Sequence, residues 1–452
     1  MQQNVPFDQN LMRAPSSVHL GKLRASAAEP NAHMPFRIFC LFMIAKPLID
    51  ITWSYGFSVG GLRLSLLSVS GGMVAVIGVA LVVAGRVKTN AIAQLFYLFL
   101  ACFILSYFLD ASQLARSKSM VVLDQFLRLM SNVAVLLFGI AFSLRRSFND
   151  LVTLVQCIWL GINAALFVNM VAIALGLESY GISDGMDRNN GLYHDAGVLA
   201  IIAVQNLCVC MYLPSLQLRS RRKIPTWMIY GSLLVAIVFM GASVSRAAIA
   251  LAACSMVVYL LMFLRSAVSV QAACILLLGV GGLCYIFLEN AISQRFTPEI
   301  VALREGVSHD ITFQHGSIDL GDFQRFGSNR GKIIEGGLNE FIRSRPADQL
   351  LGRFTFRTTH CDYVDILGRF GIVGLSVYLI LLLSSLRALV LISRQVRTVP
   401  VRALVSLATS FLVMYIFYSI PFRPLWYTTN SWYVWLLLGM VVGTNKQSTK
   451  RV

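Results

Sequence analysis

The sequence contains few charged residues, and few acidic ones in particular. Only 13% of its 452 residues are Asp, Glu, Lys or Arg, whereas soluble domains contain about 25%. Hydrophobic residues make up 57% of the chain, and its mean hydropathy is +0.70. Because water cannot solvate so much apolar surface, this composition excludes a soluble enzyme, a fibrous protein and a disordered chain. It favours a multi-pass membrane protein.

Other signals are also missing from the chain. Eight of the nine cysteines lie in apolar runs, without the spacing of a disulfide framework or a metal site, so we expect no metal and no cofactor. No cleavable signal peptide is evident, since the first apolar run begins near Phe36 after a long polar tail. No internal repeat is present either, which argues against the transporter folds built from two related halves.

Apolar segments of about 20 residues can span a membrane as helices, and the sequence contains twelve candidates. They are 36–53, 64–84, 91–109, 124–144, 151–177, 196–213, 225–242, 247–264, 271–289, 366–386, 403–420 and 430–443. The predicted fold is therefore all-α, with about twelve transmembrane helices. The chain divides into an N-terminal tail 1–35, nine helices within 36–289, a large polar loop 290–365, three helices within 366–443 and a C-terminal tail 444–452.

The net charge of +17 falls on one side of the predicted membrane. If the N-terminus is cytoplasmic, the cytoplasmic segments contain 20 basic and three acidic residues, whereas 290–369 contains ten of each. This distribution follows the positive-inside rule and predicts that both termini are cytoplasmic and the large loop is periplasmic. The excess of positive charge therefore reports topology and does not indicate a nucleic-acid partner.

The large loop contains a predicted amphipathic helix, because five of its apolar residues recur at helical spacing. These residues are Ile333, Ile334, Leu338, Phe341 and Ile342. Two placements are open: the helix lies along the membrane surface, among the lipids, or it packs on a small core within the loop itself.

Nine of the ten basic residues in 290–369 are arginines. A guanidinium group binds phosphate through two parallel hydrogen bonds, so this preference indicates an anionic ligand such as a lipid pyrophosphate. The alternative is that most of these arginines pair with the ten acidic residues of the same region. Arg246 lies in a tight turn between two spans, where a charge without a partner is costly.

His360 precedes the tenth span, at a position where a general base could act. A histidine can take a proton from a sugar hydroxyl at neutral pH. At helical spacing His360 would share a face with Tyr363, while Asp362 and Asp365 would form a second pair. The alternative is a surface histidine at a helix start. The four external histidines show no metal-ligand spacing; they are His194, His309, His315 and His360.

These motifs, in this order, resemble the O-antigen polymerase and O-antigen ligase superfamily of bacterial inner-membrane glycosyltransferases. Similar features are a large periplasmic loop before the last three spans and an Arg-containing loop after the fifth span. The segments that carry the resemblance are Asp187–Gly191, Ser245–Ala247, Ser328–Lys332, Leu351–Arg353 and His360–Gly374. One departure is Cys361, which stands where the ligases commonly have Asn and looks more like exopolysaccharide and capsule polymerases.

The resemblance implies metal-independent, inverting transfer of a glycan from a polyprenyl-pyrophosphate donor to an acceptor hydroxyl at the periplasmic face. His360 would be the catalytic base, with Asp362, Tyr363 and Asp365 orienting it or binding sugar. The candidates for binding the pyrophosphate are Arg188, Arg246, Arg330, Arg353 and Arg357. The implied partners are the lipid-linked glycan, membrane lipids, and a flippase and chain-length regulator of the same pathway.

Three functions remain open. The first is a polymerase of repeat units for exopolysaccharide, capsule or O-antigen. The second is an O-antigen ligase that transfers finished polymer to the lipid A core in lipopolysaccharide biosynthesis. The third, of another class, is a transporter or flippase for lipid-linked sugars, for which the in-membrane charges Lys46, Asp50 and Asp124 are the main candidates.

Overall fold

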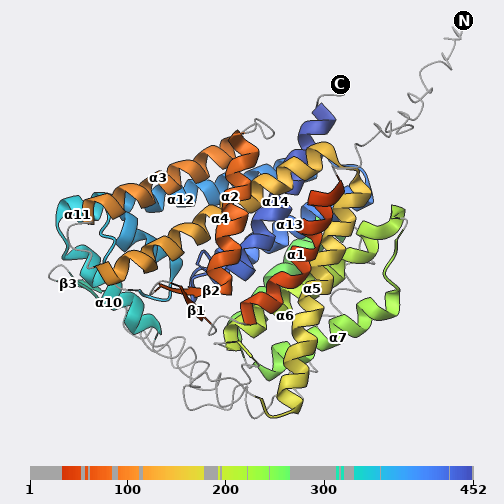
Figure 1. The fold of residues 1–452 in the computed structure, drawn as a ribbon, viewed down its shortest axis with the longest axis horizontal. Coiled ribbons are helices and arrows are strands. Elements are labelled where there is room, and N and C mark those ends of the chain that lie inside the picture. Colours follow the sequence, from red (N-terminus) through yellow and green to blue (C-terminus); the bar gives the residue numbers. More distant parts are fainter. Residues whose placement is uncertain are drawn as a thin grey trace, which may run out of the picture.

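The structure is a computed structural model of the chain. The residues that it describes are 33–51, 56–59, 62–83, 90–110, 116–177, 192–193, 196–220, 222–243, 245–264, 312–314, 317–319, 330–356, 358–426 and 428–449. They form a bundle of helices with two short antiparallel hairpins (Figure 1).

The elements follow in chain order. The first half comprises α1 (His33–Ile51), β1 (Gly56–Val59), β2 (Leu62–Ser65), α2 (Leu66–Val83), α3 (Ala91–Asp110), α4 (Arg116–Arg145), α5 (Phe148–Ala174) and α6 (Ala196–Leu216). Next come the 3₁₀ turn η5 (Gln217–Arg219), α7 (Thr226–Ala242), α8 (Arg246–Val258) and the π-helical turn η6 (Tyr259–Leu264). The remainder comprises β3 (Thr312–Gln314), β4 (Ser317–Asp319), α10 (Arg330–Ile342), α11 (Pro346–Leu351), α12 (Asp362–Gln395), α13 (Val399–Tyr418) and α14 (Thr428–Thr449).

Each predicted span coincides with a helix, except 271–289, which lies outside the described residues. Among the described residues, six helices are long and apolar enough to cross a membrane. They are Ala91–Asp110, Val122–Arg145, Phe148–Ala174, Gly197–Leu216, Asp362–Gln395 and Val399–Tyr418. The chain is therefore a helical, membrane-embedded, multi-pass protein. The fold is consistent with the predicted all-α class, and the described residues add only two short hairpins to the helices.

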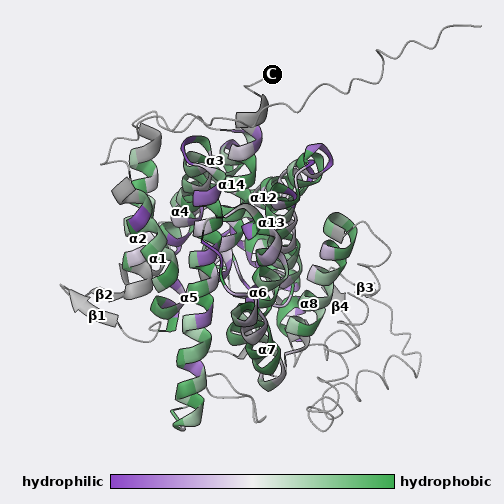
Figure 2. Ribbon diagram, turned by 90° about the vertical axis from the view of Figure 1, so that its right-hand side faces the viewer, coloured by the Kyte–Doolittle hydropathy of each residue, from purple (hydrophilic) through white to green (hydrophobic). Residues whose placement is uncertain are grey.

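Hydrophobic side chains cover the outside of the bundle as well as its core. Figure 2 shows apolar residues dominating the helices, and large apolar side chains such as Phe108, Trp227 and Leu261 are 69–74% exposed. Such a surface is suited to lipid. Inside, α4 and α14 approach closely because Gly139 and Gly439 face the partner backbone, where an added Cβ would collide with it.

The helix α12 is broken by a kink close to its start. Gly371 has φ +67° and ψ −171°, and Gly352, at the end of α11, has φ +84°. The two backbones touch here, since a Cβ on Gly371 would collide with the Leu350 carbonyl and one on Gly352 with the Arg369 carbonyl. The helix α12 (Asp362–Gln395) is therefore longer than the predicted span 366–386 at both ends, and the kink at Gly371 separates its first turns from the rest.

Candidate functional site

His360 lies in the turn that precedes α12, not in the helix. α12 begins at Asp362 with Cys361 as its N-cap, and His360 has φ +59°, the left-handed region, with its side chain exposed. Within the described residues it is the one non-glycine residue with positive φ. The prediction that His360 shares a helical face with Tyr363 is therefore wrong, because the helix starts two residues later.

Asp365 fixes the backbone on both sides of His360. Its Oδ1 accepts hydrogen bonds from the backbone N–H of Thr359 at 2.6 Å and from the Thr359 hydroxyl at 2.8 Å. Its own N–H donates to the Cys361 carbonyl at 2.9 Å. On the other side, Arg423 Nη1 donates to Asp365 Oδ2 at 3.2 Å. Since the Asp365 side chain is fully buried, this clamp orders the turn that carries His360.

Asp362 and Tyr363 tie the start of α12 to the end of α13 and to the loop that follows it. Asp362 Oδ2 accepts from the Leu425 N–H at 2.9 Å, and the Asp362 N–H donates to the Ser419 carbonyl at 2.9 Å. The Tyr363 hydroxyl donates to the Ile416 carbonyl at 2.8 Å. These contacts hold the segment 419–426 against α12 and so place Arg423 beside Asp365.

Arg353 is the one predicted phosphate-binding arginine whose side chain the structure describes. Arg353 is exposed. Its backbone N–H donates to the Gly368 carbonyl and its side-chain Nε donates to the Thr355 hydroxyl, each at 2.9 Å. Thr355 in turn donates from its N–H and its hydroxyl to Asp110 Oδ2, both at 2.8 Å. The end of α3 therefore positions Arg353 next to α12.

The other predicted arginines fall wholly or partly outside the described part of the chain. Arg188 and Arg357 lie outside the described residues. Arg246 is the first residue of α8, with Ser245 as N-cap, and Arg330 is the first residue of α10; their side chains also lie outside the described part. The structure thus brings together His360, Asp362, Tyr363 and Asp365 at the start of α12, and it places Arg353 against Gly368 further along the same helix.

Two arginines of this region were not selected from the sequence. Arg423 lies between Pro421 and Pro424 in an otherwise apolar stretch, the same signal that selected Arg246. Arg369 is 6% exposed, donates to Gln125 Oε1 at 2.9 Å and lies over the ring of Phe354. The Nε atoms of both arginines are buried without a hydrogen-bond partner.

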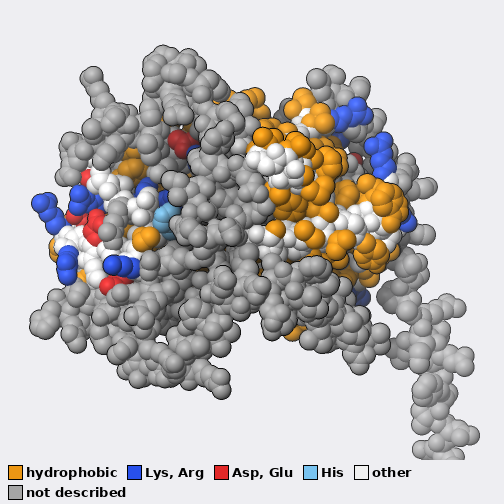
Figure 3. Space-filling view, turned by 90° about the horizontal axis from the view of Figure 1, so that it is seen from below, with side chains coloured by type: hydrophobic (Ala, Val, Ile, Leu, Met, Phe, Trp, Pro, Cys, Tyr) orange, Lys and Arg blue, Asp and Glu red, His pale blue; other side chains and the backbone are white. Residues whose placement is uncertain are grey.

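A cleft of about 540 Å³ lies between α10, α11 and the start of α12. Its polar lining includes Asn339, Glu340, Arg343, Asp348 and Arg353, and Phe356 contributes an aromatic wall. Figure 3 shows acidic and basic side chains gathered at the end of the molecule where α10 and α11 lie, and hydrophobic ones at the other end. The cleft is therefore polar, with charges of both signs.

The apolar face of α10 packs on a small core. Ile334, Leu338 and Phe341 pack against a cluster of Phe356, Cys361 and Val364. Of the two placements open for the amphipathic helix, this favours packing within the loop region, here together with the start of α12. Gly337 lets α10 approach Thr359 closely, since a Cβ at this position would collide with the Thr359 methyl group.

Cys361, next to His360, is 4% exposed. Burial, with smaller contributions from the neighbouring carboxylates, raises the pKa of its thiol to about 11. At neutral pH the sulfur is therefore a thiol and not a thiolate, so it lacks the nucleophilic form.

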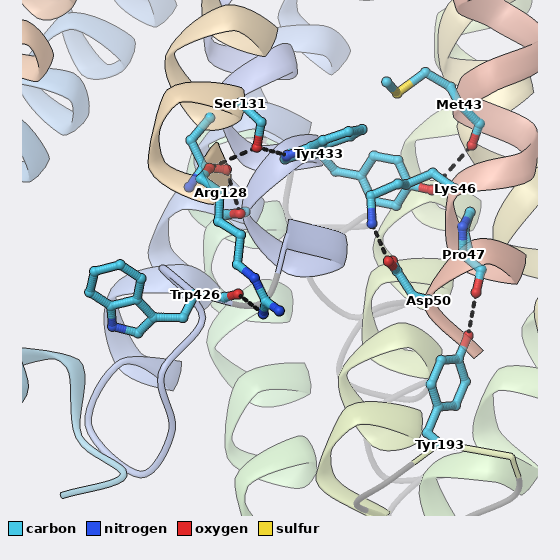
Figure 4. A network of polar contacts seen from close by, with 12 residues as sticks. Met43, Lys46, Pro47, Asp50, Arg128, Ser131, Tyr193, Trp426 and Tyr433 are labelled. Carbon is cyan, nitrogen blue, oxygen red and sulfur yellow. Dashed lines mark hydrogen bonds and ion pairs between the residues drawn. The ribbon is translucent and has the colours of Figure 1, made fainter. Parts of the chain in front are cut away.

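A second buried charge pair lies within α1. Lys46 Nζ forms an ion pair with Asp50, and both side chains are almost fully buried. Lys46 also lies 4.8 Å from the centroid of the Trp432 ring. Pro47 has no N–H for the Met43 carbonyl, which instead accepts from the Tyr433 hydroxyl at 3.4 Å. Figure 4 shows the pair with Met43, Pro47 and Tyr433.

Arg128 lies near this pair, with Asp124 and Trp426 as its partners. Asp124 Oδ2 is 2.8 Å from Arg128 Nη2, and the Trp426 carbonyl accepts from Arg128 Nη1 at 2.9 Å. Trp426 ends the segment 419–426 that also carries Arg423. One loop therefore contacts both the charges around α1 and the turn of His360.

The chain matches no protein-family model, and no curated protein sequence matches it. Within the described ranges, no group of three or more His, Cys, Asp or Glu side chains is placed to hold a metal ion. What the geometry offers is an exposed histidine on an ordered turn, the Arg423 guanidinium paired with the carboxylate that holds this turn, and a polar cleft on the adjoining helices.

Proposed function

We propose that this protein is a glycosyltransferase that polymerises polyprenyl-pyrophosphate-linked repeat units into exopolysaccharide, capsule or O-antigen. In this proposal it lies in the bacterial inner membrane with both termini in the cytoplasm and His360 at the periplasmic face. The observation that carries the proposal is the exposed histidine in a left-handed backbone conformation, held by buried Asp365. Backbone strain of this kind gathers at functional sites.

The reaction follows from these groups. The neutral imidazole of His360 takes the proton of an acceptor hydroxyl while the hydroxyl oxygen attacks the anomeric carbon of the donor sugar. The bond between that carbon and the pyrophosphate oxygen breaks, and the pyrophosphate leaves with the electron pair, so the configuration inverts. Arg188, Arg246, Arg330 and Arg357 are the proposed ligands of the leaving group, because fixed guanidinium groups stabilise developing negative charge in a partly dry site.

The test is a reconstituted reaction with the purified protein and its lipid-linked repeat unit. A ladder of longer lipid-linked products supports the polymerase. We expect His360→Ala to reach the membrane in normal amount and to lower the rate of extension by about 10²–10⁴-fold, the usual contribution of a general base. Normal polymer lengths in the His360→Ala variant would show that His360 is not the general base.

The same experiment separates the other two functions. A protein that leaves repeat units unextended but attaches finished polymer to lipid A core is a ligase. The buried Lys46–Asp50 pair is the observation that favours a transporter. Movement of the lipid-linked oligosaccharide across a vesicle membrane, without any new glycosidic bond, would establish that function.

A further inference from the structure

We infer that the cleft between α10, α11 and the start of α12 is the binding site for the sugar residues of the acceptor glycan. This inference rests on the proposed function. It assigns Arg353 and its neighbours in the cleft to the glycan, and leaves the pyrophosphate to the other arginines.

The cleft adjoins the elements that carry His360. Phe356, which lines it, lies against Gly368 of α12, where an added Cβ would collide with the aromatic ring. Gly337 of α10 lies against Thr359, the residue before His360. The cleft and the turn of His360 therefore adjoin the same two helices, α10 and α12. In this inference a glycan bound in the cleft extends from there to the imidazole.

The lining of the cleft offers both hydrogen-bond donors and acceptors. Two guanidinium groups, Arg343 and Arg353, line the cleft together with two carboxylates, Glu340 and Asp348, and the amide of Asn339. Sugar hydroxyls both donate and accept hydrogen bonds, so they match a wall that offers donors and acceptors together. A pyrophosphate would meet two carboxylates here, and a polyprenyl chain would meet six polar side chains, since Ser344 also lines the cleft.

Hydrogen bonds hold the walls of the cleft in place. The Gln349 side-chain amide of α11 donates to the carbonyls of Phe341, Ile342 and Ser344 at 3.3, 2.7 and 3.2 Å, which ties the end of α10 to α11. Thr355 and Asp110 position Arg353 on the opposite side. A wall that is ordered before binding loses less conformational entropy when a ligand arrives. Its volume of about 540 Å³ is also within the usual range of ligand sites.

The experiment measures glycan binding directly, without relying on turnover. The probe is the free oligosaccharide repeat unit, released from the lipid carrier by mild acid and titrated into the purified full-length protein by calorimetry. We expect Asp348→Asn and Arg353→Gln each to raise Kd about tenfold or more, since each removes a hydrogen bond from a charged group. In the reconstituted reaction both raise the KM for acceptor more than they lower kcat.

Two controls keep the outcomes separate. Arg345→Ala removes an exposed charge that adjoins α11 but does not line the cleft, and we expect its Kd to stay within twofold of the unchanged protein. His360→Ala should bind the oligosaccharide normally and extend it about 10²–10⁴-fold more slowly. If His360→Ala binds and extends normally, the proposed mechanism fails while the cleft assignment stands.

Three results would overturn the cleft assignment. The first is the absence of saturable oligosaccharide binding to the unchanged protein. The second is an unchanged Kd in both cleft variants, each folded as judged by its thermal unfolding midpoint. The third is displacement of the bound oligosaccharide by inorganic pyrophosphate, which would make the cleft a site for the leaving group.

Discussion

At the scale of single residues, the backbone of His360 is the most informative feature. A non-glycine residue in the left-handed region costs about 1–3 kcal/mol, and here buried hydrogen bonds from Thr359 to Asp365 hold it. The strain depends on the backbone and not on the imidazole. It can therefore be separated from catalysis by changing the residue to ones that differ in backbone freedom.

We expect His360→Gly to be more stable than His360→Ala by about 1 kcal/mol, because glycine adopts positive φ without a Cβ clash. Both variants lack the imidazole, so both should extend the glycan about 10²–10⁴-fold more slowly than the unchanged protein. Thermal unfolding in detergent measures the difference in stability. A His360→Ala variant as stable as His360→Gly would mean that the turn is not strained.

We expect Arg423 to affect both stability and glycan extension through its ion pair with Asp365, in which the two side chains are 3.2 Å apart. Arg423→Ala leaves a fully buried carboxylate without its charged partner and should lower the free energy of unfolding by about 1–3 kcal/mol. The Arg423 side chain is 19% exposed, which keeps the effect below that of a fully buried pair. Arg423→Lys keeps the charge and should restore part of both the stability and the rate of glycan extension. If Arg423→Lys is neither more stable nor more active in glycan extension than Arg423→Ala, the contact between Arg423 and Asp365 is not electrostatic.

The reaction of the Cys361 thiol with maleimide is expected to depend on pH. Its pKa of about 11 lies above the usual value near 8.5, so the reactive thiolate forms only as the pH rises toward 11. We expect maleimide to label Cys361 far more slowly at pH 7.5 than it labels a free cysteine, and labelling to speed up steeply between pH 9 and 11. Peptide mapping by mass spectrometry resolves it from the other eight cysteines. Fast labelling of the folded protein at pH 7.5 would contradict the burial of this residue.

At the scale of elements, the kink of α12 against the end of α11 shapes the site. Gly371 combines positive φ with a backbone contact to Leu350 and Gly352, so both conformation and space require glycine there. Gly371→Ala should lower the free energy of unfolding by at least about 1–2 kcal/mol. The matched control is Gly231→Ala in α7, where nothing lies within 4 Å of the added Cβ; it should be neutral or stabilising.

The measurement is the thermal unfolding midpoint of the two glycine variants, together with the Kd for the free oligosaccharide. Because the kink adjoins Arg353 and Gly368, Gly371→Ala should also weaken oligosaccharide binding, whereas Gly231→Ala should not. Equal midpoints in the two variants would show that the contact between α11 and α12 is looser than the structure has it.

The sequence predicts the helices well because a membrane span needs about 20 apolar residues in a row, which is a local property. It does not predict the break at Gly371, since that conformation depends on α11 packing into the kink. It also misplaces His360 on a helix, because helical spacing cannot reveal that Thr359 bonds to Asp365. Arg423 escapes notice for the same reason, as its partner Asp365 lies 58 residues earlier.

At the scale of the whole molecule, one loop connects two sets of buried charges. The segment 419–426 bonds to α12 through Asp362 and Asp365 and to α4 through the Trp426 carbonyl and Arg128. Arg128 in turn lies near the Lys46–Asp50 pair of α1 (Figure 4). Charges inside a membrane bundle are retained for function or because removing one alone leaves the other without a partner.

These two explanations of the Lys46–Asp50 pair predict different behaviour for a variant in which both residues are replaced. Lys46→Met alone leaves Asp50 buried without its partner and should cost about 3–5 kcal/mol. Lys46→Met with Asp50→Leu replaces the pair by apolar side chains and should recover most of that stability. If the protein is a polymerase whose chemistry lies at His360, the double variant also extends the glycan at a near-normal rate. A double variant that is as stable as the unchanged protein but makes no polymer would instead show that the Lys46–Asp50 pair is required for function, as the transporter hypothesis expects.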